Sequence, residues 1–196
     1  MDLLRKHWYD LGGILSLFTF AFVFFFRETL SPYEMLMWLS LVSLFFHQLE
    51  EYRIVGTFPG MINSVMFKSS MPDRYPLNSN SALIINVGMG WLFYLLAALL
   101  GERAIWLGIA TMMVSAGNIV AHTFLFNIKG RTFRNAGMLT SWFCFLPCVI
   151  YFIHLIRSTV VPTTMDLWIG IPLGIFLNAG VFLLIDLLKN RGTGYV

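Results

Sequence analysis

The residues of this sequence best suited to chemistry lie in the segment His47-Gln48-Leu49-Glu50-Glu51-Tyr52. The segment ends a run of apolar residues, 35–46, that is typical of a membrane span. Hydrocarbon cannot solvate an imidazole or a carboxylate, so ionisable residues inside a span indicate a functional site. On an α-helix each residue advances about 100°, which places His47 and Glu51 about 40° apart and Glu50 about 60° to the other side. All three side chains can therefore point into one small volume.

A histidine and a carboxylate four residues apart on a helix can bind one metal ion, and a third ligand from another helix would complete an open catalytic site. We expect His47 and either Glu50 or Glu51 to be metal ligands. The other glutamate would then be the general base that activates a metal-bound water. In the alternative interpretation the segment is a solvated helix end, with both glutamates paired to Arg53 or Lys68, but solvation does not account for His47.

A second polar group follows in a later apolar run, where Asn118 and His122 share a helix face with Thr111 and Ser115. His122 is the expected third metal ligand. Asn118 is expected to orient His122 or to bind a substrate oxygen, and Asn86 is a further candidate for substrate binding. Alternatively, these polar groups only connect helices through hydrogen bonds.

The composition places these residues in a membrane protein. Of 196 residues, 58% are hydrophobic and 12% are charged, and the mean hydropathy is +0.74. Soluble domains carry about twice that charged fraction, so lipid is the natural solvent. The net charge of +3 is modest and its basic residues are scattered, which argues against a nucleic-acid partner. Cys144 and Cys148 are expected to be buried apolar residues rather than a disulfide.

We expect an all-α fold: a polytopic membrane helix bundle that forms one domain over residues 1–196. Six spans are predicted, at residues 10–26, 33–52, 82–100, 104–126, 136–156 and 165–188. The polar segment 56–81 is expected to be functional or mobile, with a short helix or cap at 60–67. When the segments outside the six spans are assigned alternately to the two sides of the membrane, one side has ten Lys and Arg residues and the other has three. The positive-inside rule then predicts that both termini and the long segment are cytoplasmic.

This topology sorts the polar residues by depth. Glu51, His122, Asn86 and Asp186 all fall near the cytoplasmic ends of their spans, so Asp186 is a further candidate ligand unless it pairs with a neighbouring lysine. His154 falls near the opposite face, which argues against a role with the others. The predicted site therefore lies at the cytoplasmic leaflet, among membrane lipids.

The chain resembles the HxxEE-motif family of small multi-span membrane proteins over about residues 41–126. The resemblance rests on His47-Gln48-Leu49-Glu50-Glu51-Tyr52, Phe58-Pro59-Gly60, Gly117-Asn118 and His122. The family has no settled biochemical function. The resemblance therefore implies that His47, Glu50 and Glu51 are motif residues and implies no reaction.

The arrangement is also similar to that of the intramembrane prenyl-protein endopeptidases, which use paired Glu, His and Asn on helices. Their Glu-Glu-x-x-x-Arg spacing is absent here, because Arg53 follows Glu51 by only two residues.

These observations favour a membrane-embedded, metal-dependent enzyme. We expect it to hydrolyse an ester, amide or peptide bond in a lipidic or membrane-bound substrate. Zinc suits two histidines and a carboxylate, and iron or manganese would also suit them. A di-metal oxidase or desaturase is an alternative, although such sites use about four carboxylates and two histidines. An ion- or proton-coupled transporter and a scaffold protein with a polar helix network are also compatible with these residues, and the oligomeric state stays open.

Overall fold

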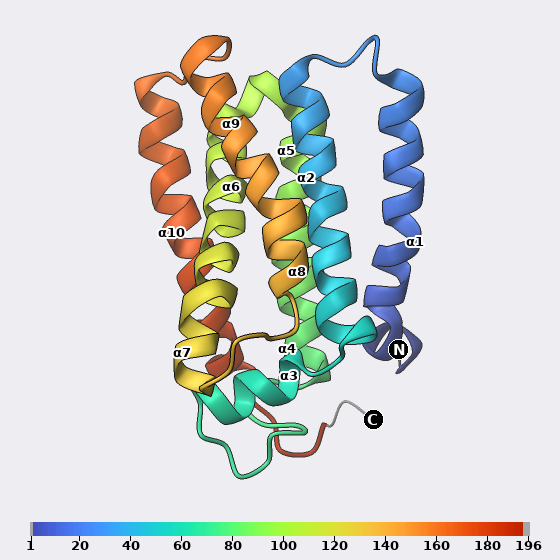
Figure 1. Cartoon of the computed structure of the whole chain (residues 1–196), viewed down its shortest axis with the longest axis vertical. Helices are drawn as coiled ribbons and strands as arrows, with labels where there is room; N and C mark the ends of the chain where they lie inside the picture. Colours follow the sequence, from blue (N-terminus) through green and yellow to red (C-terminus); the bar gives the residue numbers. More distant parts are fainter. Residues whose placement is uncertain (1, 194–196) are drawn as a thin grey trace.

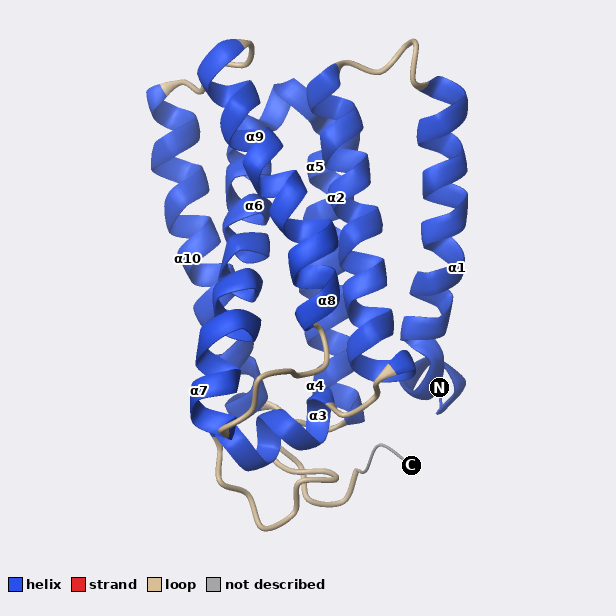
Figure 2. Ribbon diagram, in the orientation of Figure 1, coloured by secondary structure: helices blue, strands red, loops and turns tan. Residues whose placement is uncertain are grey.

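The computed structural model describes residues 2–193, in which the regular secondary structure is helical, with no strand. The helices group along the chain into six long legs, which run alternately up and down as a bundle (Figures 1 and 2). In chain order the legs are α1 (Asp2–Phe26); α2 (Pro32–Leu49) with η1 (Glu50–Ile54); α4 (Ser79–Leu83) with η3 (Ile84–Trp91) and α5 (Leu92–Leu100); α6 (Ile105–Val120) with η5 (Ala121–Leu125) and α7 (Phe126–Gly130); α8 (Met138–Thr140) with η6 (Ser141–Phe145) and α9 (Leu146–Ser158); and α10 (Thr164–Leu187). Each predicted span overlaps one leg, but the leg of α2 and η1 does not reach the length and hydropathy of a candidate membrane span.

Four stretches of the described chain are long and apolar enough to cross a membrane: Leu4–Phe26, Ser79–Gly130, Met138–Ser158 and Thr164–Leu187. The second of them contains two legs, because the 3-10 turn Gly101–Ala104 (η4) reverses the chain within it. By length and composition these helices are compatible with an integral membrane protein.

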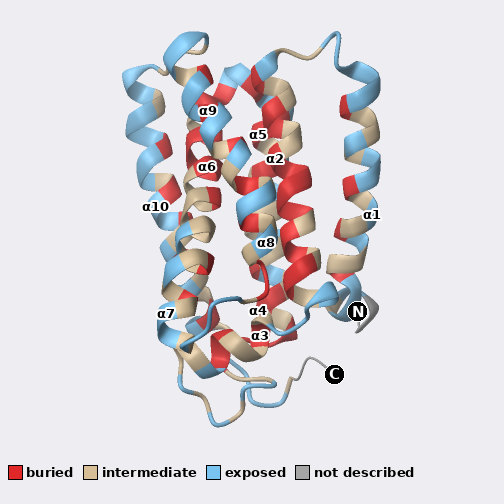
Figure 3. Cartoon of the chain, viewed as in Figure 1, coloured by how far each residue is buried: buried red, intermediate tan, exposed pale blue. Residues whose placement is uncertain are grey.

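The outer surface of the bundle is rich in large apolar side chains. Phe25 on α1 is 77% exposed, Phe143 on η6 is 74% exposed and Trp168 on α10 is 72% exposed. Buried residues follow the inward faces of the legs instead (Figure 3). Soluble monomers rarely expose apolar surface on this scale, whereas hydrocarbon accommodates it.

Local sequence signals start the legs. Ser31 begins α2 with a capping box, since its hydroxyl accepts from the Glu34 amide and the Glu34 carboxylate accepts from the Ser31 amide. Thr163 and Asp166 form the same pair at the start of α10. Such caps satisfy amide groups that the first helical turn leaves without a partner.

Legs α6 and α10 pack closely because small residues line their contact. A Cβ added at Gly170 would lie 2.7 Å from the Trp106 carbonyl oxygen, and one at Gly174 would lie 2.7 Å from the Met113 sulfur. Small residues let membrane helices approach in this way.

Residues 56–81, here called the cap, close the end of the bundle at which α1 begins and α10 ends (Figure 1). The expected short helix is present as α3 (Phe58–Met61) and η2 (Ile62–Met66). Asn63 is fully buried and organises the cap. Its Nδ2 donates to the carbonyls of Pro72 (2.9 Å) and Leu77 (2.8 Å), and its Oδ1 accepts from the Leu77 amide (2.8 Å).

Replacing Asn63 by alanine is expected to loosen the cap while the bundle stays intact. Three hydrogen bonds worth about 1 kcal/mol each are lost, so amides in the cap should exchange with deuterium about 100-fold faster. Hydrogen–deuterium exchange read by mass spectrometry measures the effect. Asn80→Ala is the control, because the Asn80 side chain makes no hydrogen bond with the described residues. Equal exchange in the two variants would contradict the assignment.

Candidate metal centre

Three side chains from two legs converge near the capped end of the bundle. The Glu51 Oε1 lies 3.4 Å from the His47 Nε2 and 3.3 Å from the His122 Nε2. One ligand atom from each residue lies within 4.8 Å of the other two. His47 and Glu51 stand on consecutive turns of α2 and η1, and His122 comes from η5. The structure thus brings together His47, Glu51 and His122, the His/Glu cluster, as the sequence predicted.

The His/Glu cluster is sealed from solvent. The exposed fractions of His47, Glu51 and His122 are 2%, 4% and 0%. Phe58 of the cap covers the cluster, with its ring stacked on the His122 imidazole at a centroid distance of 5.7 Å. The three side chains are therefore removed from bulk water, and ions and dipoles interact more strongly in such an interior.

The hydrogen bonds of Thr140 fix the tautomer of His47. The Thr140 Oγ1 lies 2.6 Å from the Glu50 Oε2, a distance typical of a hydroxyl donating to a carboxylate. The hydroxyl has one hydrogen, so it accepts from the His47 Nδ1 at 2.9 Å. In the neutral imidazole of His47 the proton is then on Nδ1, and Nε2 presents a lone pair.

Asn135 fixes the tautomer of His122 in the same way. Its Nδ2 donates to the His122 carbonyl oxygen and to the Asn127 Oδ1, each at 2.8 Å. The Asn135 Oδ1 is therefore the acceptor that lies 2.6 Å from the His122 Nδ1. In the neutral imidazole of His122 this orientation places the proton on Nδ1 and leaves the Nε2 lone pair free.

Both Nε2 atoms are buried and have no hydrogen-bond partner among the described residues. Each one faces the Glu51 carboxylate, so with neutral imidazoles two lone pairs and a negative charge meet with no donor between them. Buried acceptors in such an arrangement are costly unless a cation shares the space. The two N–O separations of 3.3 and 3.4 Å match the edge of about 3.3–3.4 Å of a tetrahedron built with zinc-ligand bonds, and all three ligand atoms lie within 4.8 Å of one another. The donor set therefore fits a divalent metal ion.

Glu50 does not join the His/Glu cluster, which corrects its expected place as a ligand or general base. Its carboxylate turns toward the start of α8 and accepts from the amides of Leu139 (3.3 Å) and Thr140 (2.8 Å) and from the Thr140 hydroxyl. These donors occupy the carboxylate and connect it to His47 through Thr140. Glu50 thus orients a ligand from outside the cluster.

The glutamates do not form a solvated helix end. Glu50 and Glu51 are 5% and 4% exposed. Arg53 pairs instead with Asp10 of α1 at 3.2 Å. Arg53 therefore pairs with neither motif glutamate, and both carboxylates lie in the interior.

Four of the legs widen into π-helical turns around the His/Glu cluster. Glu51 lies in η1, His122 in η5 and Asn86 in η3, and η6 begins directly after Thr140. π-Helical turns are rare and occur frequently at functional sites. No feature of the sequence signals them.

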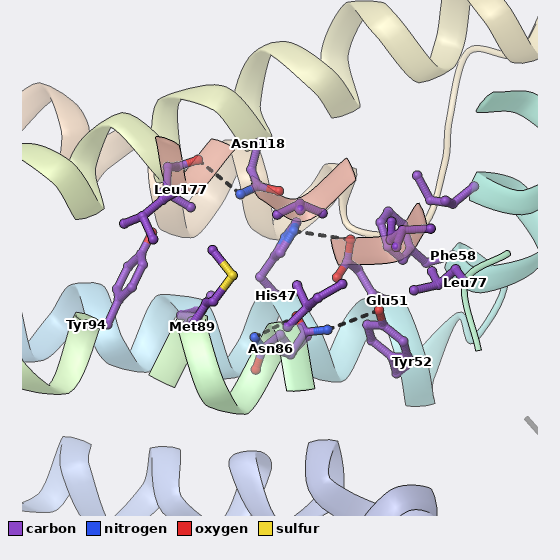
Figure 4. Close-up of a pocket in the computed structure, with 18 of the residues that line it drawn as sticks. His47, Glu51, Tyr52, Phe58, Leu77, Asn86, Met89, Tyr94, Asn118 and Leu177 are labelled. Atoms are coloured by element: carbon purple, nitrogen blue, oxygen red, sulfur yellow. Dashed lines mark hydrogen bonds and ion pairs between the residues drawn. The ribbon is translucent and has the colours of Figure 1, made fainter. Parts of the chain in front are cut away.

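A cavity of about 120 Å³ adjoins the His/Glu cluster (Figure 4). Its lining includes the cluster residues His47 and Glu51 and both predicted substrate-binding residues, Asn86 and Asn118. The Asn86 Nδ2 donates to the Tyr52 hydroxyl at 3.2 Å. Asn118 donates to a carbonyl of its own helix and does not orient His122, so Asn135 performs the role expected of Asn118.

Other candidates lie away from the cluster. Asp186 pairs with Lys189 at 2.7 Å on the surface and is not a ligand. His154 is exposed on α9 and takes no part. Cys144 and Cys148 form no disulfide, as expected, and Cys148 is buried, whereas Cys144 is only half-buried.

Thr140→Val is expected to weaken zinc binding by about 10- to 100-fold, as losses of groups that orient a metal ligand do. Valine keeps the shape but removes the hydroxyl that accepts from His47 and donates to Glu50. Thr140→Ser retains that hydroxyl and should bind zinc as the parent does. Competition with a fluorescent zinc chelator measures both affinities, and equal affinities would show that the hydroxyl has no orienting role.

A family model described as "Protein of unknown function with HXXEE motif" matches residues 38–152, more than half of the chain. The chain belongs to this family. The region shared with the HXXEE family contains the whole His/Glu cluster together with Asn135 and Thr140. No curated protein and no solved structure matches the chain.

The structure gives the HXXEE motif a physical interpretation. The motif histidine, His47, and its second glutamate, Glu51, both point into the cluster, one helical turn apart. The first glutamate, Glu50, reaches Thr140, which accepts from His47. Each fixed position of the motif therefore either forms the cluster or orients it.

Proposed function

We propose that this HXXEE-family protein is a membrane-embedded, metal-dependent hydrolase that acts on a lipidic or membrane-bound substrate. The observation that supports the proposal is the convergence of two imidazole Nε2 atoms and one carboxylate in the interior, where neither Nε2 has a hydrogen-bond partner among the described residues. Zinc suits this donor set, and iron and manganese also bind histidine and carboxylate ligands.

We place all six legs across the membrane, with the capped end in the cytoplasm. Apolar side chains on the outer surface support the placement. Basic residues gather toward the capped end, in accord with the positive-inside rule: Lys68, Arg74, Lys129, Arg131 and Arg134. The His/Glu cluster then lies near the cytoplasmic leaflet.

In the proposed reaction the metal ion and the two motif glutamates have different roles. His47, His122 and the Glu51 Oε1 would hold a divalent ion, which would supply polarisation of a carbonyl and a more acidic water. Glu51 also lines the cavity, and the second oxygen of its carboxylate would accept the proton of that water. Water adds to the carbonyl carbon, the C–O or C–N bond breaks, and the leaving alcohol or amine takes the proton. Glu50 keeps an orienting role.

The hydrolase fits the cluster better than the di-metal oxidase does. Di-metal sites of helical bundles use about four carboxylates. Glu51 is the one carboxylate among the cluster residues in the described chain, and the Glu50 carboxylate is already occupied by Leu139 and Thr140.

Reconstituted vesicles test the proposal. Purified protein loaded with zinc is presented with single-chain and two-chain lipid esters and amides, and released acid is measured by mass spectrometry. We expect release that a chelator stops, that added zinc restores and that His122→Ala lacks. Two irons per chain would overturn the proposal in favour of an oxidase. A metal-free protein with ion flux sensitive to Glu51→Gln would overturn it in favour of a transporter.

A further inference from the structure

The cavity beside the His/Glu cluster extends well past it along the bundle axis. Figure 4 shows Glu51, Tyr52 and Phe58 at one end and Tyr94 and Leu177 at the other. Along the leg of η1 and α2 the lining runs from Glu51 back to Leu44, a separation of seven residues or about 10 Å of helix. The part between the cluster and Tyr94, here called the slot, is therefore long and narrow.

The polar groups of Gln48, Asn86 and Tyr52 gather at the cluster end of the slot, where they form one directed network. The Trp91 Nε1 donates to the Gln48 Oε1 (2.7 Å), and the Gln48 Nε2 donates to the Asn86 Oδ1 (3.0 Å). The Asn86 Nδ2 then donates to the Tyr52 hydroxyl (3.2 Å). The hydroxyl accepts in this network, so its own hydrogen is available to a carbonyl oxygen beside Glu51.

The rest of the slot offers little to a polar ligand. Met89, Phe93, Val114 and Leu177 present hydrocarbon, or sulfur in the case of Met89. The Tyr94 hydroxyl is already used, since it bonds within the bundle to the Thr111 carbonyl and to Ser115. Asn118 is the exception, and its amide is bonded to its own helix. A saturated chain satisfies such walls because it has no hydrogen-bonding group to bury.

Three residues of the slot lining also reach the outer surface of the bundle and form what is here called the seam. Met89 and Phe93 on η3 and α5, and Val181 on α10, line the cavity and keep partial exposure. Gly180 allows this close approach, since a Cβ there would lie 3.3 Å from the Met89 methyl carbon. An apolar chain in the hydrocarbon layer would meet this seam from the side.

We propose that the slot binds one unbranched acyl chain, with its ester or amide carbonyl between the Tyr52 hydroxyl and the His/Glu cluster. The substrate class is then a single-chain lipid ester or amide. The reaction of this substrate rests on the proposed function, but binding of the chain to the slot requires no metal. Tyr52 supplies the hydrogen bond to the carbonyl oxygen.

Photolabelling tests the slot directly. The probe is a medium-chain fatty alcohol with a diazirine in its chain, applied to the full-length protein with and without a chelator. Mass spectrometry of the peptides locates the label. We expect labels on Met89, Phe93 and Leu177, removed by excess decanol. Labels confined to the outer surface, such as Phe24 and Phe25, would overturn the proposal.

Two glycines on η3 give a matched pair of variants. Gly90 lines the cavity, and a Cβ there would be in contact with Gln48 and Leu44, whereas a Cβ at Gly88 meets nothing within 4 Å. Gly90→Leu should fill the slot and reduce slot labelling at least about tenfold, and Gly88→Leu should leave it unchanged. Val114→Phe fills the slot from α6 and should act like Gly90→Leu if the latter unfolds. Equal labelling in filled and parent proteins would overturn the proposal.

His122→Ala separates the slot from the metal. Slot labelling that persists in this variant supports the slot whether or not zinc binds to the parent protein. If the parent protein hydrolyses the substrate in a zinc-dependent reaction but shows no slot labelling, the proposal that the slot binds an acyl chain would be wrong and the hydrolase proposal would be supported. The two proposals can therefore fail separately.

Discussion

His122→Ala is expected to lower bound zinc from about one ion per chain to below about a tenth of that, because two protein ligands do not hold zinc in the way three or four do. His122 is fully buried and supplies a ligand from a different leg than His47 and Glu51. Elemental analysis of protein purified without a metal-affinity tag gives the ratio. The loss should be accompanied by complete loss of chelator-sensitive hydrolysis.

His154→Ala is the matched control for this loss. It removes an imidazole of the same type, but His154 is exposed on α9, away from the cluster. Zinc should stay near one ion per chain in that variant. Zinc that falls with His154→Ala and persists with His122→Ala would place the ion on the surface.

Gly137→Ala is expected to disrupt the metal centre without changing any ligand. Gly137 precedes α8 with a φ of +94°, which L-residues avoid at a cost of about 1–2 kcal/mol. Its added Cβ would lie 2.5 Å from the His122 Cε1 and 2.8 Å from the His47 Cε1. Both imidazoles must move, so zinc affinity should fall by more than about 100-fold, since ligands displaced from their geometry bind weakly. Chelator competition and thermal unfolding measure the two effects.

Gly60→Ala provides the comparison within the cap. A Cβ at Gly60 meets nothing within 4 Å, so zinc affinity and melting temperature should both match the parent. If Gly137→Ala also retained the parent affinity, the close packing of the two imidazoles around Gly137 would be wrong.

The sequence predicted the legs well because their signals are local. Apolar runs of sufficient length, a capping box at Ser31 and Pro32, and a reversal near Glu102 define helix and turn without knowledge of the tertiary fold. The first leg is longer than expected, since α1 begins at Asp2 rather than near residue 10.

Within the site, His47 and Glu51 could be predicted from i, i+4 spacing and from depth. Glu50 could not be placed, because the amides of Leu139 and Thr140 that hold its carboxylate are distant in the sequence. The expected face shared by Asn118 and His122 assumed about 100° per residue, whereas the chain widens into a π-helical turn at Ala121, between the two residues.

The partners of the two histidines lay outside the reach of sequence patterns. Asn135 follows a group of basic residues after α7, and the positive-inside rule already explains those residues without a role in the site. Thr140 lies at the end of a three-residue helix. Neither stands at a fixed spacing from His47 or His122. Only the path of residues 131–140 over the end of the bundle brings them together.

X-ray diffraction from crystals of the zinc-loaded protein, with data on both sides of the zinc absorption edge, tests most directly whether the His/Glu cluster binds a metal ion. We expect one anomalous peak within about 2.0–2.2 Å of the His47 Nε2, the His122 Nε2 and a Glu51 carboxylate oxygen. Well-defined side chains in the same map with no anomalous peak between them, or with a hydrogen-bonded water in that place, would contradict the metal centre.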